Sequence, residues 1–142
     1  MPETFNILKI EHIGIAVNDL QKASMLLKLL GLNASKTKNI DSENVKVVKY
    51  STSNNNHKIE LLEGTSLSSP ISTFIKKRGE GVHHIALEVD NIENAMKYLT
   101  EKNIKLVYEH IRLGADNKLI NFIHPDSCPG ILIELCQQKK RD

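Results

Sequence analysis

Residues 11–17 of the chain read EHIGIAV, and residues 83–89 read HHIALEV. Each stretch is followed downstream by a second near-identical segment, IELL at residues 59–62 and IELC at residues 133–136. The chain therefore contains two copies of one module, with a histidine and a glutamate at matching points of both. If the copies pack around a pseudo-twofold axis these side chains converge, which predicts a metal site. The four candidate ligands are His12, Glu60, His84 and Glu134.

Size and composition are those of an ordinary globular domain. The 142 residues are 40% hydrophobic and 25% charged, enough to bury a core. A net charge of +2 and an aromatic content of 4% argue against a nucleic-acid partner. We find no membrane-spanning apolar run and no signal or transit pattern, so we expect a cytoplasmic protein with no membrane partner. Cys128 and Cys136 are expected to be reduced thiols.

Hydrophobic periodicity predicts the same order of elements in both modules, one strand and one helix followed by three strands. The predicted strands of the first module span residues 9–17, 33–39, 45–51 and 58–63, around a helix from 19 to 30. The second module begins with its own strand at residue 83 and a helix from about residue 91. Its later strands are predicted at residues 105–111, 118–124 and 131–136.

The predicted fold class is α+β. Two tandem β-α-β-β-β modules, about 8–63 and 81–137, form a cupped eight-stranded mixed sheet with helices on the outer face. We expect them to make one domain, residues 1–142. The linker between them carries a short helix over about residues 70–78, because Pro70 is well suited to the first helical position.

The two module helices have matching start and stop signals. Asn18 and Asp90 stand where each helix begins, and both residue types are favoured N-caps. Gly31 and Asn103 stand where each helix ends, and both residue types tolerate the left-handed backbone found there. This agreement in capping residues makes the duplication the firmest inference from the sequence.

The two repeated glutamates interrupt apolar strands. Strand alternation places Glu60 and Glu134 on the face opposite their Ile and Leu neighbours. If the Ile/Leu face packs on the helices, both carboxylates point into the space that the sheet encloses. A buried carboxylate without a partner costs several kcal/mol or takes up a proton. A metal ion would stabilise both, although a solvated outer face is the other interpretation of this pattern.

The repeated histidines lie beside small residues. His12 shares its face with Gly14, and His84 shares its face with Ala86, so each imidazole has room for a ligand. Two imidazoles and two carboxylates suit a divalent ion in five- or six-coordination, such as Co²⁺, Mn²⁺, Ni²⁺ or Zn²⁺. On an octahedral ion, two adjacent positions would stay open for water or a bidentate substrate. That arrangement suits Lewis-acid stabilisation of an enolate.

The remaining histidines are less informative. His83 points away from His84 and is expected in the core or behind the ligands. His124 precedes Pro125 at the end of a strand, where it either binds substrate or orders the turn. His57 and His110 have no partner that the sequence identifies.

Beyond the repeat itself, the chain resembles the vicinal-oxygen-chelate superfamily, which includes glyoxalase I, extradiol dioxygenases and bleomycin-resistance proteins. Within it, the resemblance is greatest to the methylmalonyl-CoA epimerase family. The segments that carry it are HIGIAV at 12–17, IELLE at 59–63, GEGVHHIA at 79–86, INFIHP at 120–125 and GILIEL at 130–135. The GEGVHH and FIHP…IEL segments are the more specific to epimerases.

The resemblance implies the four metal ligands that the repeat selects, with one divalent ion and Co²⁺ as the first choice. It implies interconversion of (R)- and (S)-methylmalonyl-CoA through a metal-chelated enolate, in propionate metabolism and in a homodimer. Epimerisation needs a proton donor or acceptor on each face of the intermediate. We expect Glu134 to move one proton.

The second catalytic group departs from the family pattern. Some family members carry a proposed base, a glutamate, within the third strand, but the matching stretch VKVV at residues 45–48 has no carboxylate. Glu43, just before it, is the candidate, and a metal-bound water is the alternative. The implied acyl-CoA substrate carries phosphates, for which basic side chains are available. These are Lys36, Lys38, Lys76, Lys77 and Arg78.

Three other functions fit parts of the pattern. A glyoxalase I-type lactoylglutathione lyase uses the same metal geometry, and only the segments near Gly79 and His124 separate it from an epimerase. A metal-free drug-sequestering protein of the same fold is disfavoured because all four ligands are present. An iron dioxygenase is disfavoured because its site uses two histidines and a single carboxylate.

Overall fold

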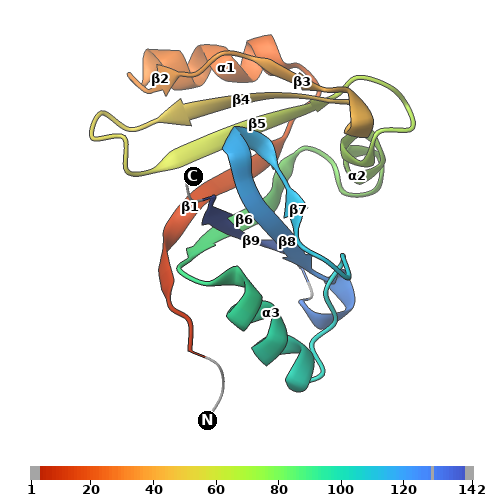
Figure 1. The fold of residues 1–142 in the computed structure, drawn as a ribbon. Helices are drawn as coiled ribbons and strands as arrows, with labels where there is room; N and C mark the ends of the chain where they lie inside the picture. Colours follow the sequence, from red (N-terminus) through yellow and green to blue (C-terminus); the bar gives the residue numbers. More distant parts are fainter. Residues whose placement is uncertain (1–3, 129, 140–142) are drawn as a thin grey trace. The chain divides into compact units, whose positions relative to one another are not determined.

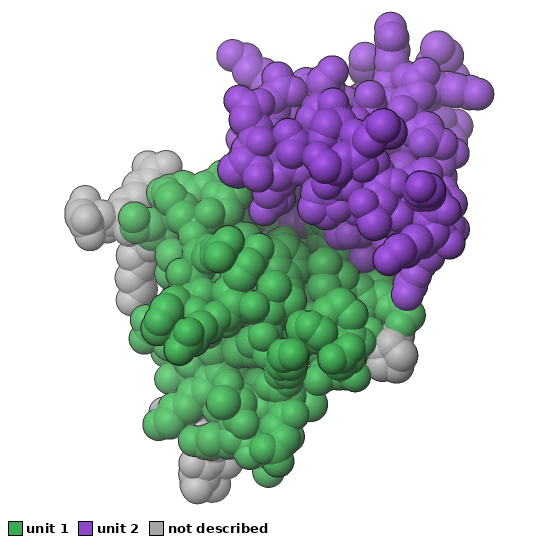
Figure 2. Space-filling view, turned by 90° about the vertical axis from the view of Figure 1, so that its right-hand side faces the viewer, with its two compact units in different colours: residues 1–11, 84–142 green, residues 12–83 purple. Residues whose placement is uncertain are grey.

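The computed structural model describes residues 4–128 and 130–139. The chain divides into two compact units (Figure 2). Residues 12–83 form the N-terminal unit, and residues 1–11 together with 84–142 form the C-terminal unit. The strand β1 (Ile7–Ala16) is divided between them, so its first half belongs to the C-terminal unit. The expectation of a single domain stays a prediction.

The N-terminal unit is a mixed sheet with two helices. Its strand order is β2-β4-β5-β1, in which β1 runs parallel to β5 and antiparallel pairing joins β4 to β5 and to the short β3. The strands are β2 (Asn33–Ala34), β3 (Lys38–Ile40), β4 (Val45–Ser51) and β5 (Lys58–Gly64). The helices are α1 (Leu20–Leu29) and α2 (Pro70–Arg78), and the predicted bounds of the linker helix are confirmed.

The C-terminal unit repeats this arrangement (Figure 1). Its strand order is β6-β9-β8-β7, with β6 parallel to β9 and antiparallel pairing elsewhere. The strands are β6 (Gly81–Val89), β7 (Arg112–Leu113), β8 (Lys118–Ile123) and β9 (Leu132–Gln138), and the helix is α3 (Ile92–Glu101). Each unit therefore contains a mixed sheet, as the predicted α+β fold class requires.

Two predicted strands differ from the structure. The segment 33–39 is split into β2 and β3, and the short β7 (Arg112–Leu113) lies just after a predicted strand, so the described residues form nine strands rather than eight. The segment 105–111 is no regular strand and has a single bridge, Leu106 to Ile123. Its backbone bonds to Phe122 and His124 through Val107 and Lys105. At Tyr108 the partner is the fully buried amide of Asn121, which accepts from Tyr108 N at 3.1 Å and donates to Tyr108 O at 3.0 Å. A side chain thus takes the place of the next strand at that residue.

In each unit the module helix covers the face opposite the predicted ligand glutamate. Leu61 packs with α1 residues, including Leu20 and Leu27, and Leu135 packs with Ile92 and other α3 residues. Glu60 and Glu134, one position away on the strands, therefore face the other side. Helix α2 packs on that other side of the N-terminal sheet, where residues such as Leu62 meet it.

The helix starts lie one residue later than predicted. Asp19 caps α1 by accepting from Lys22 N, and Asn91 caps α3 by accepting from Asn94 N. The predicted cap Asp90 has another role, since its carboxylate accepts bonds from the backbone and side-chain nitrogens of Asn6 at 2.7 and 2.9 Å. These bonds hold the pKa of the Asp90 carboxyl below its usual value.

The other predicted cap, Asn18, donates its backbone N–H to Glu80. The predicted helix ends are confirmed, because Gly31 and Asn103 both have left-handed backbones, with φ of 87° and 61°. Among the described residues, no helix is long and apolar enough to cross a membrane.

Candidate metal centre

All four predicted ligands are buried side chains on strands. His12 and His84 are 4% and 5% exposed, and Glu60 and Glu134 are 6% and 9% exposed. The strand register places Gly14 opposite Glu60 and Ala86 opposite Glu134. The small residues predicted to lie beside the two imidazoles therefore also lie opposite the two carboxylates.

In the N-terminal unit, the histidine and the glutamate of the repeat are brought together. His12 Nε2 lies 3.7 Å from Glu60 Oε1. The second oxygen, Glu60 Oε2, lies 3.9 Å from Lys49 Nζ, and the Lys49 side chain is only 11% exposed. The two oxygens of one carboxylate thus face two different nitrogen groups.

In the C-terminal unit, the equivalent pair also meets. The ligand atoms of His84 and Glu134 lie within 4.8 Å of each other. The strand register places Phe122, an aromatic residue, opposite Glu134. Its ring makes an edge contact with the Tyr108 ring, at a centroid distance of 6.0 Å.

The donor set fits a divalent ion of borderline hardness. Each repeat supplies one imidazole and one carboxylate, and these are ligand types for Zn²⁺, Co²⁺, Ni²⁺ and Mn²⁺. The donor atoms of His12 and Glu60 are 3.7 Å apart, and those of His84 and Glu134 are within 4.8 Å of each other. An ion fits between two donors at such separations, because each donor binds it at about 2.0–2.2 Å. A buried carboxylate also needs a positive partner, because its charge is costly in a poorly solvated site.

A second buried ion pair lies in the C-terminal unit. Lys118 Nζ is 2.6 Å from Glu11 Oε1, and the two side chains are 10% and 0% exposed. The Cys136 thiol is fully buried. Burial and then the nearby charge of Glu134 raise its pKa to about 12, so this thiol is a neutral group.

The predicted second catalytic group lies at the surface. Glu43 ends a 3₁₀ turn (Asp41–Glu43) that leads directly into β4, and it is exposed. The five basic residues predicted to meet coenzyme A are also exposed, with three of them in the last turn of α2.

The other histidines take structural positions. His83 is half-buried and makes an edge contact with Phe74 of α2, at 5.0 Å between ring centroids, which fits the expected core location. His124 Nδ1 accepts a hydrogen bond from Asp126 N at 3.1 Å, so it orders the turn after β8. His57 and His110 are exposed.

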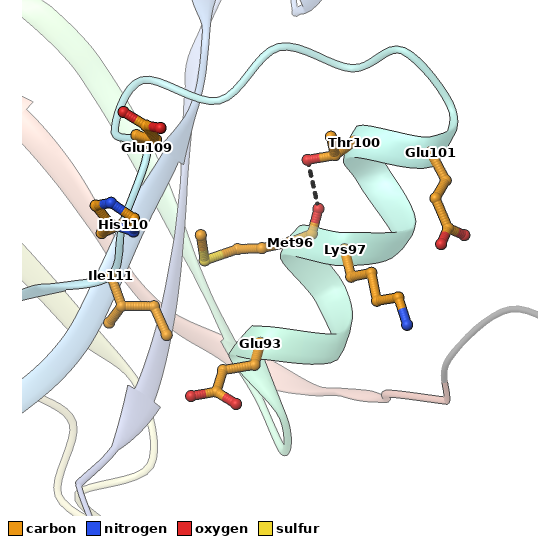
Figure 3. A pocket seen from close by; sticks show the side chains of 8 residues that line it. All are labelled: Glu93, Met96, Lys97, Thr100, Glu101, Glu109, His110 and Ile111. Atoms are coloured by element: carbon orange, nitrogen blue, oxygen red, sulfur yellow. Dashed lines mark hydrogen bonds between the residues drawn. The ribbon is translucent and has the colours of Figure 1, made fainter.

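A surface pocket of about 640 Å³ lies in the C-terminal unit between α3 and the segment 109–111 (Figure 3). Met96 and Ile111 point toward each other across it, and Thr100 Oγ1 donates to Met96 O at 2.8 Å. His110 is among its lining residues, whereas none of the four predicted ligands is. The pocket is therefore separate from the candidate centre.

Three charged residues of the interior were missed by the sequence analysis. They are Lys49, which is largely buried beside Glu60, and the buried pair Glu11 and Lys118. The available signal was the same one that identified the ligands, a charge within a largely apolar strand. Only the strand register shows which charges meet.

Comparison with known proteins gives a consistent result. The model of the Glyoxalase/Bleomycin resistance protein/Dioxygenase superfamily matches residues 11–122. The mitochondrial methylmalonyl-CoA epimerase of Homo sapiens is 38% identical over 135 residues, covering 94% of this chain and 76% of the human protein.

Solved structures agree with this match. Methylmalonyl-CoA epimerase from Mycobacterium tuberculosis has a TM-score of 0.88 and 31% identity, covering 94% of this chain and 90% of its own. A methylmalonyl-CoA epimerase in complex with methylmalonyl-CoA and NH4+ has a TM-score of 0.85 and 29% identity, covering 94% and 96%.

Proposed function

The chain belongs to the methylmalonyl-CoA epimerase family of the glyoxalase/bleomycin resistance protein/dioxygenase superfamily and is an isomerase of the epimerase class; we propose that it interconverts (R)- and (S)-methylmalonyl-CoA. The observation that carries the proposal is the buried histidine–glutamate pair in each repeat. The solved relative in complex with methylmalonyl-CoA supports an acyl-CoA substrate. The reaction would remove the proton at C2 and return one to the opposite face.

We propose that one divalent ion is held by both pairs, with Co²⁺ as the first choice and Mn²⁺, Ni²⁺ and Zn²⁺ as alternatives. The ligands are His12, Glu60, His84 and Glu134. Such an ion supplies positive charge close to the oxygens on which negative charge develops as the C2 proton leaves. The chemistry of the donors supports this assignment, since each side chain is of a type that binds these ions.

Two carboxylates are proposed to move protons. The C2 proton lies between a thioester and a carboxylate, and its transfer needs one group on each face of the planar intermediate. Glu134 is proposed for one face, because it is a buried carboxylate beside His84. Glu43 is proposed for the other, because it precedes β4, the strand that carries Lys49 next to Glu60.

Binding of the coenzyme would use charge at the surface. The exposed basic residues are proposed to meet the coenzyme A phosphates, where point charges suit flexible phosphate groups. They are Lys36, Lys38, Lys76, Lys77 and Arg78. The homodimer and the cytoplasmic location also stay predictions.

The test is proton exchange followed by NMR in D₂O. Purified, cobalt-loaded protein is mixed with methylmalonyl-CoA, and entry of deuterium at C2 is followed with and without a chelator. We expect rapid exchange that the chelator stops and added Co²⁺ restores. Glu63→Gln serves as the control, because Glu63 lies on the same strand as Glu60 but on the opposite face.

Three results would contradict parts of the proposal. Exchange that survives complete metal removal would exclude the ion from the mechanism. No exchange by folded, metal-loaded protein would exclude this substrate, and hemithioacetals of glutathione would be tested next. Failure to bind any divalent ion would leave the metal-free binding protein as the better account.

A further inference from the structure

Lys49 is a buried cation in the middle of a sheet. It lies on β4 directly opposite Glu60 in the strand register, and its side chain is 11% exposed. Lysine is rarely buried to this extent unless its charge is paired. Lys46 on the same strand is opposite Glu63, on the other face. Lys49 therefore places its charge beside the carboxylate of a proposed ligand, whereas Lys46 does not.

The contacts of Glu60 suggest that explanation. Its Oε1 is 3.7 Å from His12 Nε2, whereas its Oε2 is 3.9 Å from Lys49 Nζ. The carboxylate is thus oriented with one oxygen toward the histidine and the other toward the ammonium group. A carboxylate binds a cation through one oxygen or through both, and the second mode requires both oxygens to face the ion.

We propose that Lys49 is a positioning residue that holds the second oxygen of Glu60, so that Glu60 gives a metal ion one oxygen only. The inference rests on the proposed function, since it concerns the same ion. It adds a role for a residue outside the ligand set. The lysine acts by its fixed positive charge and needs no proton transfer.

One-oxygen binding has a consequence for the substrate. A six-coordinate ion with four protein donor atoms keeps two positions for substrate oxygens. If Glu60 gave both oxygens, one position would be left, and a thioester oxygen and a carboxylate oxygen would not both bind. Lys49 thus weakens metal binding through repulsion and keeps the site open for a chelating substrate.

The C-terminal repeat shows that this arrangement is not required by the fold. The residue opposite Glu134 in the register is Phe122, which has no charge to hold a carboxylate oxygen. The strand position that places a lysine beside Glu60 therefore places an uncharged ring beside Glu134.

The experiment measures the water bound to Mn²⁺ in the full-length protein. Water-proton relaxation reports how many exchanging water molecules the ion carries, and titration of the metal gives its Kd. The variant is Lys49→Met, which keeps the side-chain length. Lys46→Met is the matched control, Lys49→Arg restores the charge, and Lys49→Gln serves if the methionine variant fails to fold.

We expect Lys49→Met to lose about half of the relaxation per bound Mn²⁺, because Glu60 takes one water position with its second oxygen. Mn²⁺ should bind about fivefold more tightly, because a nearby positive charge is gone. Turnover should fall at the same time. Lys49→Arg should return all three properties toward wild type, and Lys46→Met should change none of them.

This combination separates positioning from structural damage, which would weaken metal binding rather than strengthen it. Unchanged relaxation and Kd in a folded Lys49→Met or Lys49→Gln protein would overturn the role of Lys49 and leave the metal site intact. Wild-type protein that binds no Mn²⁺, Co²⁺, Ni²⁺ or Zn²⁺ would overturn the proposed metal function together with this inference.

Discussion

Glu60 and Glu134 hold equivalent places in the two repeats, yet the strand beside each presents a different residue. Lys49 lies opposite Glu60, and Phe122 lies opposite Glu134. The N-terminal carboxylate therefore has a cation at 3.9 Å, while the C-terminal strand places an aromatic ring at the matching position. The two repeats therefore share the proposed ligands but differ in the charges around them.

What the repeats share is the apparatus that positions the ligands. Both put a small residue opposite the glutamate, Gly14 in one and Ala86 in the other. Both cover the opposite face of the strand with the module helix. A duplicated backbone thus places the proposed ligands at equivalent positions, and single differences on neighbouring strands make their surroundings unequal.

The largest expected effect comes from removing a ligand, and it should be the same in either repeat. His12→Ala and His84→Ala should each lose bound metal and lower turnover by about a thousandfold or more, because the ion loses one of its few donors. Metal content after gel filtration and the rate of C2 exchange measure both effects. Circular dichroism checks that the fold is kept.

Glu60→Gln and Glu134→Gln extend this test to the carboxylates, with Glu63→Gln as the control on the opposite face of β5. A histidine variant in one repeat that kept full metal content and activity, while its counterpart lost both, would show that only one repeat forms the centre.

The second prediction concerns a buried ion pair that only the C-terminal repeat has at this position. Lys118 begins β8 and pairs with Glu11, whose side chain is fully buried, whereas the equivalent first residue of β4 is the apolar Val45. Lys118→Met should lower the free energy of unfolding by about 3–5 kcal/mol, because it leaves the Glu11 carboxylate buried without its cation. Urea denaturation measures the loss.

A double variant tells whether the pair itself stabilises the fold. Glu11→Leu with Lys118→Met should recover most of the lost stability, since an apolar pair of similar volume often replaces a buried ion pair without cost. A double variant as unstable as Lys118→Met alone would mean that packing, and not the orphaned charge, explains the loss.

The repeat in the sequence predicted most of the fold for a physical reason. Caps, terminators and strand alternation are local signals, and two copies of each signal agreed, so the helix ends at Gly31 and Asn103 were correct. The N-cap prediction was wrong by one residue, since the capping side chains are those of Asp19 and Asn91, while the Asp90 carboxylate accepts bonds from the distant Asn6. Bonds between residues far apart in the sequence have no local pattern.

In the candidate site too, local patterns predicted some features, and contacts between distant strands decide the others. The burial of His12 and Glu134 followed from alternation and the repeat. The position of Lys49 beside Glu60 depends on the register between β4 and β5, which the loop between them sets. The segment 105–111 was predicted as a strand and is irregular, and at Tyr108 its backbone bonds to the Asn121 side chain. Sequence alternation gives the face of a residue but not its neighbour on the next strand.

The smallest predicted effect concerns a hydrogen bond at the start of the module helix. Both repeats have this bond, but its acceptor is charged in one and neutral in the other. The first backbone N–H of α1, on Leu20, donates to Glu63 Oε2 at 2.8 Å, and that of α3, on Ile92, donates to Gln137 Oε1 at 2.7 Å. Glu63 and Gln137 occupy the same position, three residues after each ligand glutamate.

These two bonds should differ in strength because only one acceptor is charged. Glu63→Ala should cost about 1.5–3 kcal/mol, as expected for a charged acceptor that also faces the positive end of a helix, and Gln137→Ala about 0.5–1.5 kcal/mol. Glu63→Gln makes the N-terminal anchor chemically like the C-terminal one and should cost less than Glu63→Ala, with the difference shrinking in high salt. Urea denaturation at low and high salt measures all three variants. Equal losses for the two alanine variants would show that both anchors act as neutral hydrogen bonds, and the electrostatic difference between the repeats would then be confined to Lys49 and to the Lys118–Glu11 pair.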